Sequence, residues 1–187
     1  MLTVVYDACV LYPAPLRDLL MQLAMADIFR ARWTDQIHDE WMRNVRKNRL
    51  DLTLEQLERT RNLMNKHVRD CVVSGHEGLI SGLSLPDAND RHVLAAAINY
   101  HADAIVTFNL KDFPETALSP HGVEPIHPDD FVANELDLYQ SVVCISVKKV
   151  RSRLRNPVLS VDEYLAMLEG QGLSETVSGL RGFAEIL

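Results

Sequence analysis

Short apolar segments with acidic residues at or just beyond their ends are the feature that most constrains the fold. Residues 2–6 form an apolar, largely β-branched run that stops at Asp7, and residues 104–107 form a second run with Asp112 shortly after it. Such runs are typical of strands buried in a parallel sheet. Segments of helical periodicity lie between them, so we expect an α/β fold with a parallel sheet covered on both faces.

The remaining elements follow from periodicity and capping residues. We expect further strands at residues 32–34 and 123–126, and helices at residues 16–28, 35–45, 53–68 and 91–100. Thr34 or Asp35 can cap the second of these helices, and Thr53 with Gln56 has the spacing of a capping box. Residues 75–86, which contain three glycines and a proline, give no clear pattern.

The pattern changes to helices alone after about residue 128. Ser160 and Glu163 have the spacing of a second capping box, and residues 173–186 show helical periodicity. We therefore expect an α/β domain over residues 1–132 and an all-helical C-terminal extension over residues 133–187.

The charge of the chain is unevenly distributed. Its 187 residues carry a formal net charge of −7, which by itself argues against a nucleic-acid partner. Residues 30–70, however, hold ten basic and seven acidic residues, whereas residues 87–137 hold ten acidic and two basic ones. The basic segment is consistent either with contact to phosphate or with a solvated helix face.

Cysteine usage and hydropathy bear on the compartment. Cys9, Cys71 and Cys144 are an odd number without metal-binding spacing, which favours a reducing, cytoplasmic setting. The first residues lack a basic region before their apolar run, and no apolar run is long enough to span a bilayer. We expect neither a signal peptide nor a membrane segment.

Several acids are expected to meet at one rim of the sheet. Ligands of open parallel sheets bind beyond the carboxyl ends of the strands, where Asp7 and Asp112 stand. Asp87 and Asp90 precede the helix that leads into the strand at 104–107, and Glu40 borders the apolar stripe of its helix. Clustered carboxylates repel one another unless a cation neutralises them, and oxygen ligands suit Mg²⁺ or Mn²⁺. Such a site can generate a metal-bound hydroxide for attack on phosphorus.

Each acid taken alone also has a structural explanation. Asp90 is a plausible N-cap, Asp112 a turn residue before Phe113, and Glu40 a surface acid. Asp7 is the hardest to explain in this way, because a carboxylate at the end of a buried strand is costly without a partner.

Three segments, VVYDACVLYP, IHDEW and LPDANDRHVLAAAINYHADAIVTFNLKDFP, resemble the PIN-domain family of metal-dependent ribonucleases. The resemblance covers residues 1–132 and implies a three-layer α/β/α fold; the rest is similar to an extension carried by one branch of the family. Many bacterial members are toxins of VapBC-type toxin–antitoxin pairs. The resemblance thus implies a Mg²⁺-dependent endoribonuclease, with Mn²⁺ as a possible substitute, an RNA substrate, an antitoxin partner and a homodimer.

The resemblance also assigns roles position by position. It implies catalytic roles for Asp7, Glu40, Asp90 and Asp112, of which Asp7, Asp90 and Asp112 would hold metal, with support from Asp87, Thr107 and Asn109. Many toxins of this type have an acid where this chain has Asn109, a change that removes a negative charge. The basic residues that we expect to attract RNA are Arg43, Arg46, Lys47 and Arg49.

Two other functions remain open. One is a PIN scaffold that has lost its catalytic activity, a hypothesis suggested by Asn109 in place of an acid. Receiver-type signalling modules also gather acids at strand ends, but they need an acid pair after the first strand and a later lysine. Here Tyr6 precedes Asp7 and no such lysine is present, so this alternative is disfavoured.

Overall fold

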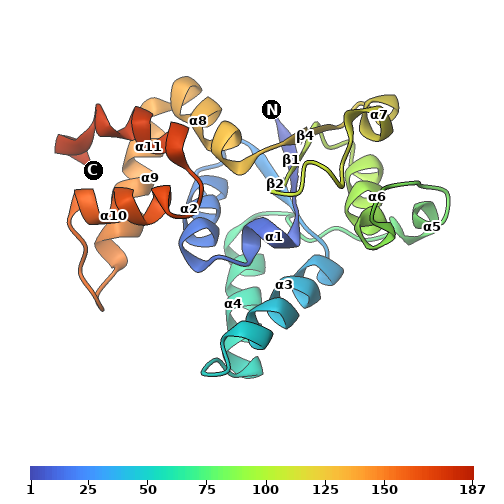
Figure 1. Cartoon of the computed structure of the whole chain (residues 1–187), viewed down its shortest axis with the longest axis horizontal. Coiled ribbons are helices and arrows are strands. Elements are labelled where there is room, and N and C mark those ends of the chain that lie inside the picture. Colours follow the sequence, from blue (N-terminus) through green and yellow to red (C-terminus); the bar gives the residue numbers. More distant parts are fainter. The chain divides into compact units, whose positions relative to one another are not determined.

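The computed structural model describes residues 1–187 (Figure 1). Its contacts divide the chain into two compact units. The first unit comprises Met1–Tyr12 and Phe29–Ile126, and the second comprises Pro13–Ile28 and His127–Leu187. The segment Pro13–Ile28 thus packs with the C-terminal helices, so the second unit is built from two separate stretches of the chain.

The first unit contains all of the strands. These are β1 (Thr3–Tyr6), β2 (Arg30–Arg32), β3 (Ala104–Val106) and β4 (Glu124–Ile126). Its helices are α1 (Ala8–Leu11), α3 (Asp35–Asn48), α4 (Leu54–His67), α5 (Glu77–Ile80), α6 (Arg91–Asn99) and α7 (Glu115–Leu118), with short 3₁₀ turns η1 (Ala88–Asp90) and η2 (Ser119–His121).

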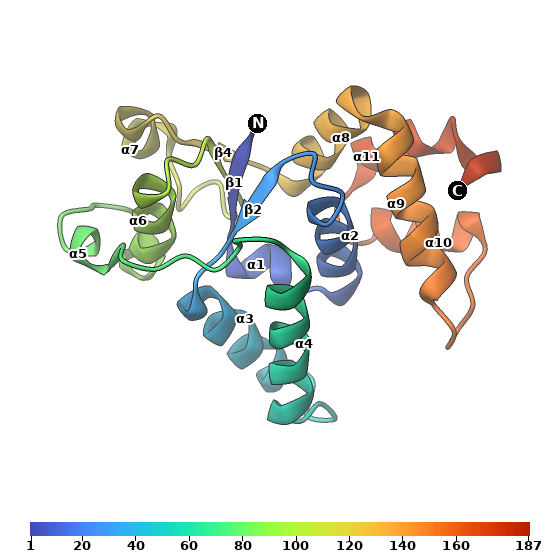
Figure 2. The same cartoon turned by 180° about the vertical axis from the view of Figure 1, so that it is seen from behind.

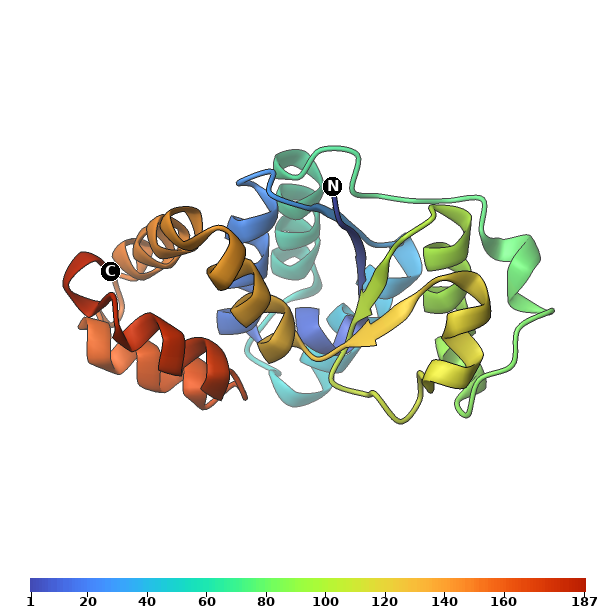
Figure 3. The ribbon, with the colours of Figure 1, turned by 90° about the horizontal axis from the view of Figure 1, so that it is seen from above.

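The four strands form one parallel sheet in the order β2-β1-β3-β4. From β1 the chain moves outward to β2 and then returns to β3 on the other side of β1. The topological switch point therefore lies between β1 and β3, where open α/β sheets bind their ligands. The alanine-rich helix α6 packs against β1 and β3 (Figure 3). The expected α/β class with a parallel sheet is confirmed.

The helices of the first unit begin where the caps predict. Thr34 is the N-cap of α3, and its side chain accepts a hydrogen bond from Ile37 N at 3.1 Å. Both hydrogen bonds of the predicted capping box join Thr53 and Gln56 at the start of α4. Helices α3 and α4 lie side by side (Figure 2).

Two short elements differ from the sequence-based expectation. Strand β2 lies two residues earlier than expected, because its pairing with β1 ends at Arg32 and Trp33 pairs instead with Val72 in an isolated bridge. Helix α1 was not expected. It begins directly after β1, with Asp7 as its N-cap.

The second unit is entirely helical, as expected for the C-terminal part. It contains α2 (Ala14–Ala24), α8 (Pro128–Leu138), α9 (Gln140–Arg153), α10 (Val161–Glu169), α11 (Ser174–Arg181) and the 3₁₀ turn η3 (Ala184–Ile186). The capping box of Ser160 and Glu163 is confirmed at the start of α10. Helices α8 and α11 pack closely where Gly179 leaves room for Leu136. None of the helices in either unit is both long and apolar enough to cross a membrane.

Candidate active site

Asp7 and Thr107 meet at the switch point of the sheet. Each follows directly on the last residue of its strand, β1 or β3, and the backbone N–H of Asp7 donates to Val106 O at 3.1 Å. The Thr107 hydroxyl donates to Asp7 Oδ2 at 2.7 Å. Asp7 is only 4% exposed, so this donor offsets part of the cost of burying its carboxylate.

Cys9 is a third member of this cluster that the sequence analysis did not identify. Its Sγ donates to Asp7 Oδ2 at 2.9 Å and lies 3.3 Å from Thr107 Oγ1, while Phe108 N donates to the sulfur. Burial and then the charge of Asp7 raise the pKa of the Cys9 thiol far above its ordinary value. Cys9 is therefore a neutral donor to Asp7, a role that only its position two residues after the acid could have indicated.

Asp90 is the point on which the other acids converge. It occupies the N-cap position of α6, but its side chain makes no capping hydrogen bond, so the capping explanation does not account for it. Burial raises the pKa of Asp90 to about 7, with further contributions from the negative charges of Asp7, Asp87, Asp112 and Glu40. The structure thus places Asp7, Asp87, Asp112 and Glu40 within electrostatic range of Asp90.

Asp87 and Asp112 reach this cluster from loops. Asp87 Oδ1 accepts a hydrogen bond from Asn89 N at 2.8 Å and so fixes the turn that leads into α6. Asp112 is half-buried, and its backbone N–H donates to Asn109 O at 2.9 Å. The Asn109 side chain is exposed, while its backbone N–H donates to Thr107 Oγ1 at 3.0 Å. Asn109 therefore supports the loop through its backbone.

Glu40 borders the cluster from α3 and contacts a buried histidine. His92 Nε2 lies 3.3 Å from Glu40 Oε2, and the His92 side chain is only 2% exposed. The spacing of the histidines in the sequence predicts no role for any of them. The available signal was the position of His92 at the start of the helix that Asp90 precedes.

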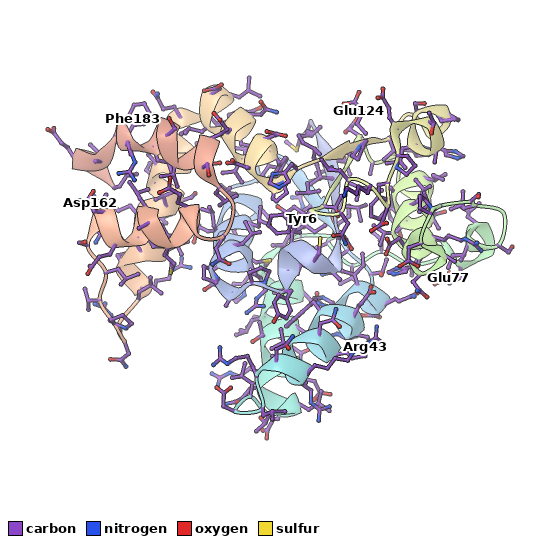
Figure 4. All side chains as sticks on the ribbon, in the orientation of Figure 1. Tyr6, Arg43, Glu77, Glu124, Asp162 and Phe183 are labelled. Carbon is purple, nitrogen blue, oxygen red and sulfur yellow. The ribbon has the colours of Figure 1, made fainter.

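Two cavities adjoin these residues. The first, of about 570 Å³, lies between α3 and the segment from α5 to α6 and is lined by Gln36, Asp39, Glu40, Arg43, Ile80, Asp87, Ala88, Asn89, Asp90 and His92. The second, of about 380 Å³, is lined by Asp39, Met42, Arg43, Arg46, Lys47 and Leu54. Arg43, labelled on α3 in Figure 4, contributes to both. Asp7 and Asp112 line neither cavity, so the carboxylate cluster lies at the edge of the first.

The expected basic residues differ in their surroundings. Arg43, Arg46 and Lys47 line the second cavity, whereas Arg49 pairs with Asp51 at 2.7 Å and lines neither. The basic run on α9 is partly engaged within its own unit, since Lys148 donates to Ile186 O and Arg151 to the carbonyls of Leu159 and Leu187.

The donor set fits a hard divalent cation in its chemistry, since every acid of the cluster offers oxygen ligands. Burial is the largest cause of the raised pKa of Asp90, and the negative charges of the neighbouring acids, which a cation would neutralise, add to it. However, no three His, Cys, Asp or Glu side chains lie close enough to form a ligand set as they stand. The two observations are compatible, because charges interact over longer distances than metal–oxygen bonds span. Binding a metal would require the carboxylates to draw closer.

Comparison with known proteins gives two family matches. Residues 3–111 match the PIN domain, and residues 128–182 match the VapC50 C-terminal domain. A Mycobacterium tuberculosis protein named "Putative ribonuclease VapC50" is 48% identical over 66 residues, which is 35% of this chain and 38% of that protein. The alignment thus spans well under half of the length of this relative. No solved structure matches the chain.

Proposed function

Because the chain belongs to the PIN-domain family, we propose that it is a metal-dependent endoribonuclease that hydrolyses RNA phosphodiester bonds. The observation that carries this proposal is the convergence of four acids on Asp90, beside the switch point of the sheet. A role as a helix cap or a turn residue could explain one of these acids alone, but not why all of them lie near Asp90. If the cluster had only a structural role, repulsion between its like charges would destabilise the fold with no compensating interaction.

Asp7, Asp90 and Asp112 are the residues that would hold the ion, with Mg²⁺ as the expected metal and Mn²⁺ as a substitute. When bound, the ion would supply a Lewis acid and an activated water for attack on phosphorus. The chain's own residues prepare this site. Thr107 and Cys9 orient the Asp7 carboxylate through their donated hydrogen bonds, and Asp87 holds the turn that presents Asp90. Glu40 provides a carboxylate on the side of the first cavity.

The second cavity supports RNA as the substrate. Arg43, Arg46 and Lys47 line this cavity with three positive charges. They lie on α3, the helix that also carries Glu40 of the acidic site. These cations can contact phosphates that flank the scissile bond. Arg49 is expected to contribute less, because Asp51 already occupies its guanidinium.

Replacing two of these cations tests their proposed contact with RNA. The pair Arg46→Ala and Lys47→Ala should weaken RNA binding and reduce the slope of log Kd against log salt by about 1 to 2, since roughly 0.7 to 0.9 counterions are released per phosphate contact. Fluorescence anisotropy with labelled RNA would measure the slope. The matched control is Arg49→Ala. An unchanged slope in the double variant would exclude these contacts.

We further propose that the protein is the toxin of a VapBC-like pair, with a cognate antitoxin, and that it is cytoplasmic and homodimeric. The name of the M. tuberculosis relative and the match of residues 128–182 to the VapC50 C-terminal domain support this role. The assignment of residues 1–132 and 133–187 to a nuclease domain and an extension belongs to the same proposal. Co-purification with the product of a neighbouring small gene would test the antitoxin, and light scattering would test the dimer.

The decisive experiment is cleavage of a mixture of purified transfer and ribosomal RNA by the full chain in Mg²⁺ or Mn²⁺, with the new ends mapped. Asp7→Asn and an excess of EDTA should each abolish cleavage. Glu58→Gln, which changes an exposed acid on α4, is the matched control and should cleave as the wild type does. Cleavage that persists in Asp7→Asn or in EDTA would refute the proposal.

The loss of catalysis on an intact PIN scaffold is the competing outcome, and the exposed Asn109 favours it. It predicts neither cleavage nor Mn²⁺ binding by calorimetry at millimolar metal. Restoration of binding by Asn109→Asp would locate the defect at this position.

A further inference from the structure

Glu40 is held by a single contact, and that contact comes from His92. No other ion pair or hydrogen bond engages the Glu40 carboxylate, which is 23% exposed at the edge of the first cavity. A glutamate side chain loses substantial rotamer freedom when it is ordered, so a site that uses it needs a partner to hold it. His92 Nε2, at 3.3 Å from Oε2, is the group within reach.

The two ring nitrogens of His92 have different surroundings. Its Nδ1 is buried and has no hydrogen-bond partner among the protein atoms, whereas its Nε2 faces a carboxylate oxygen. A neutral imidazole carries one proton, and only the tautomer with the proton on Nε2 presents a donor to Glu40. The two atoms are within 3.3 Å but are not aligned as a hydrogen bond in this structure, so donation requires a small rotation of the ring or the carboxylate, as is common before substrate binds.

The backbones on both sides of this contact are fixed by the core. On α3, Ile37 and Trp41 flank Glu40 in sequence and are fully buried. On α6, Val93 and Leu94 follow His92 and are likewise buried. Both helices are therefore anchored in the core. The buried His92 ring has a fixed position, from which it can restrain the partly exposed Glu40 carboxylate.

We propose that His92 is a positioning residue that holds Glu40 in its catalytic orientation by donating a hydrogen bond from Nε2. This inference rests on the proposed ribonuclease function, in which Glu40 acts on the substrate side of the site. In this role His92 acts through Glu40. Without it, the Glu40 side chain is free to rotate into the first cavity.

A double-mutant cycle on the rate of RNA cleavage tests this role, with an end-labelled fragment that spans a mapped cleavage site. His92→Leu should lower kcat by 10- to 100-fold with little change in KM, as is usual for the loss of a group that orients a site ligand. In a Glu40→Ala background, His92→Leu should cause no further loss, because the residue through which it acts is gone. If His92→Leu lowered kcat by the same factor in the Glu40→Ala background as in the wild type, the proposal would be overturned.

Conservative and distant substitutions separate positioning from folding. His92→Gln places an amide N–H near the position of Nε2 and should restore most of the lost rate, whereas His92→Asn is too short and should not. His67→Leu makes the same chemical change on the exposed face of α4 and should leave kcat unchanged. Equal rates in the Gln and Asn variants, with melting temperatures alike, would contradict a role for the Nε2 donor.

A spectroscopic measurement keeps the inference separable from the proposed function. Long-range ¹H–¹⁵N spectra of the wild-type ring should show His92 as the Nε2–H tautomer, with shifts that change in Glu40→Ala. The Nδ1–H tautomer, or shifts that ignore Glu40→Ala, would overturn the positioning role. If the wild type fails to cleave RNA with either metal, the ribonuclease proposal fails, while the tautomer still shows whether His92 donates to Glu40.

Discussion

Asp7 remains in its buried position because several donors surround its carboxylate. Oδ1 accepts from Ala8 N at 2.6 Å, and Oδ2 accepts from the Thr107 hydroxyl and the Cys9 thiol. Donors to a ligand carboxylate orient it for metal, and their loss typically costs 10- to 100-fold in affinity or activity. Of the two side-chain hydrogen bonds to Asp7 Oδ2, the one from the Thr107 hydroxyl is the shorter, at 2.7 Å against 2.9 Å from Cys9.

We expect Thr107→Val to weaken Mn²⁺ binding by about tenfold, because this isosteric change removes the donor to Asp7 Oδ2. Thr107→Ser keeps the hydroxyl and should bind as the wild type does. Isothermal titration calorimetry gives both affinities. Equal affinities in the Val and Ser variants would show that the hydroxyl does not act on the metal site.

The pKa of Asp90 predicts a pH dependence of metal binding. Because burial and the neighbouring acids raise this pKa to about 7, Asp90 is protonated below pH 7 in the metal-free protein. A metal must displace that proton, so the Mn²⁺ affinity should fall roughly tenfold for each pH unit below 7 and level off above it. Calorimetry between pH 5.5 and 8 in two buffers would measure the affinity and the released proton.

Asp87→Asn supplies the control for this pH dependence. Removing one of the nearby negative charges should lower the pKa of Asp90 and move the onset of weakening to lower pH. An affinity that is independent of pH, or an onset that stays in place in this variant, would contradict the electrostatic interpretation.

At the residue scale, the sequence identified the acids and Thr107 as a supporting residue, but not Cys9 or His92. Asp7, Asp90 and Asp112 stand beside strand or helix ends, and such positions can be read from local pattern. Cys9 follows Asp7 by two residues, but nothing in the local pattern shows that its thiol points back to the acid, and the contact of His92 with Glu40 joins residues far apart in the chain.

Among the elements, α11 depends on a capping residue from another helix. Asp129 on α8 is 6% exposed, and its carboxylate accepts hydrogen bonds from Glu175 N and Thr176 N, each at 2.8 Å. These backbone groups belong to the first turn of α11, which has no side-chain cap from its own N-cap residue, Leu173. Asp129 therefore satisfies two of the N–H groups that a helix start leaves unpaired.

We expect Asp129→Ala to destabilise the protein by about 2–3 kcal/mol, because the part-buried N–H of Glu175 and the buried N–H of Thr176 lose a charged acceptor. Asp129→Asn retains a single acceptor oxygen and should cost about half as much. Urea unfolding followed by far-ultraviolet circular dichroism would give both values. A cost below about 0.5 kcal/mol for Asp129→Ala would show that other groups or water replace the cap.

Elements with local signals were predicted well, and those without them were not. The two capping boxes join residues three apart in the chain, so they can be read without knowledge of the fold. Helix α1 has only four residues, too few for any periodicity. The bounds of β2 follow from where its pairing with β1 stops, which no local pattern encodes.

For the molecule as a whole, Glu135 links stability to pH. It is 3% exposed on α8, its Oε2 has no hydrogen-bond partner, and burial raises its pKa from 4.5 to about 7. The folded state thus binds this proton more tightly than the unfolded state does. The contribution of Glu135 to stability is greatest below pH 4.5, declines as the pH rises to 7, and is constant above.

We expect Glu135→Gln to be more stable than the wild type at pH 8, by at most about 3 kcal/mol, because the variant has no charge to bury. At pH 4.5 the two proteins should be equally stable. Comparing their urea unfolding curves at both pH values cancels the other titrating groups. A difference in stability that does not change with pH would exclude a raised pKa at Glu135.

The net charge of −7 describes this molecule poorly, because its charges are sorted in space. Acids gather around Asp90, while Arg43, Arg46 and Lys47 line a neighbouring cavity. The segment counts in the sequence indicated this separation. Within the basic segment, Arg49, Arg61 and Arg69 already pair with acidic side chains, whereas no ion pair is formed by Arg43, Arg46 or Lys47.

The sequence by itself determined the α/β class, the parallel sheet, most helix starts and the identities of the clustered acids. These depend on hydrophobic periodicity and on contacts within a few residues, both of which are local. Only the tertiary structure decided that residues 13–28 pack with the C-terminal helices, that Thr107 and Cys9 both donate to Asp7, and that His92 lies beside Glu40. Apart from Cys9, which lies two positions from Asp7, these pairings join residues dozens of positions apart, and the free energy that selects them comes from packing and burial of the whole chain.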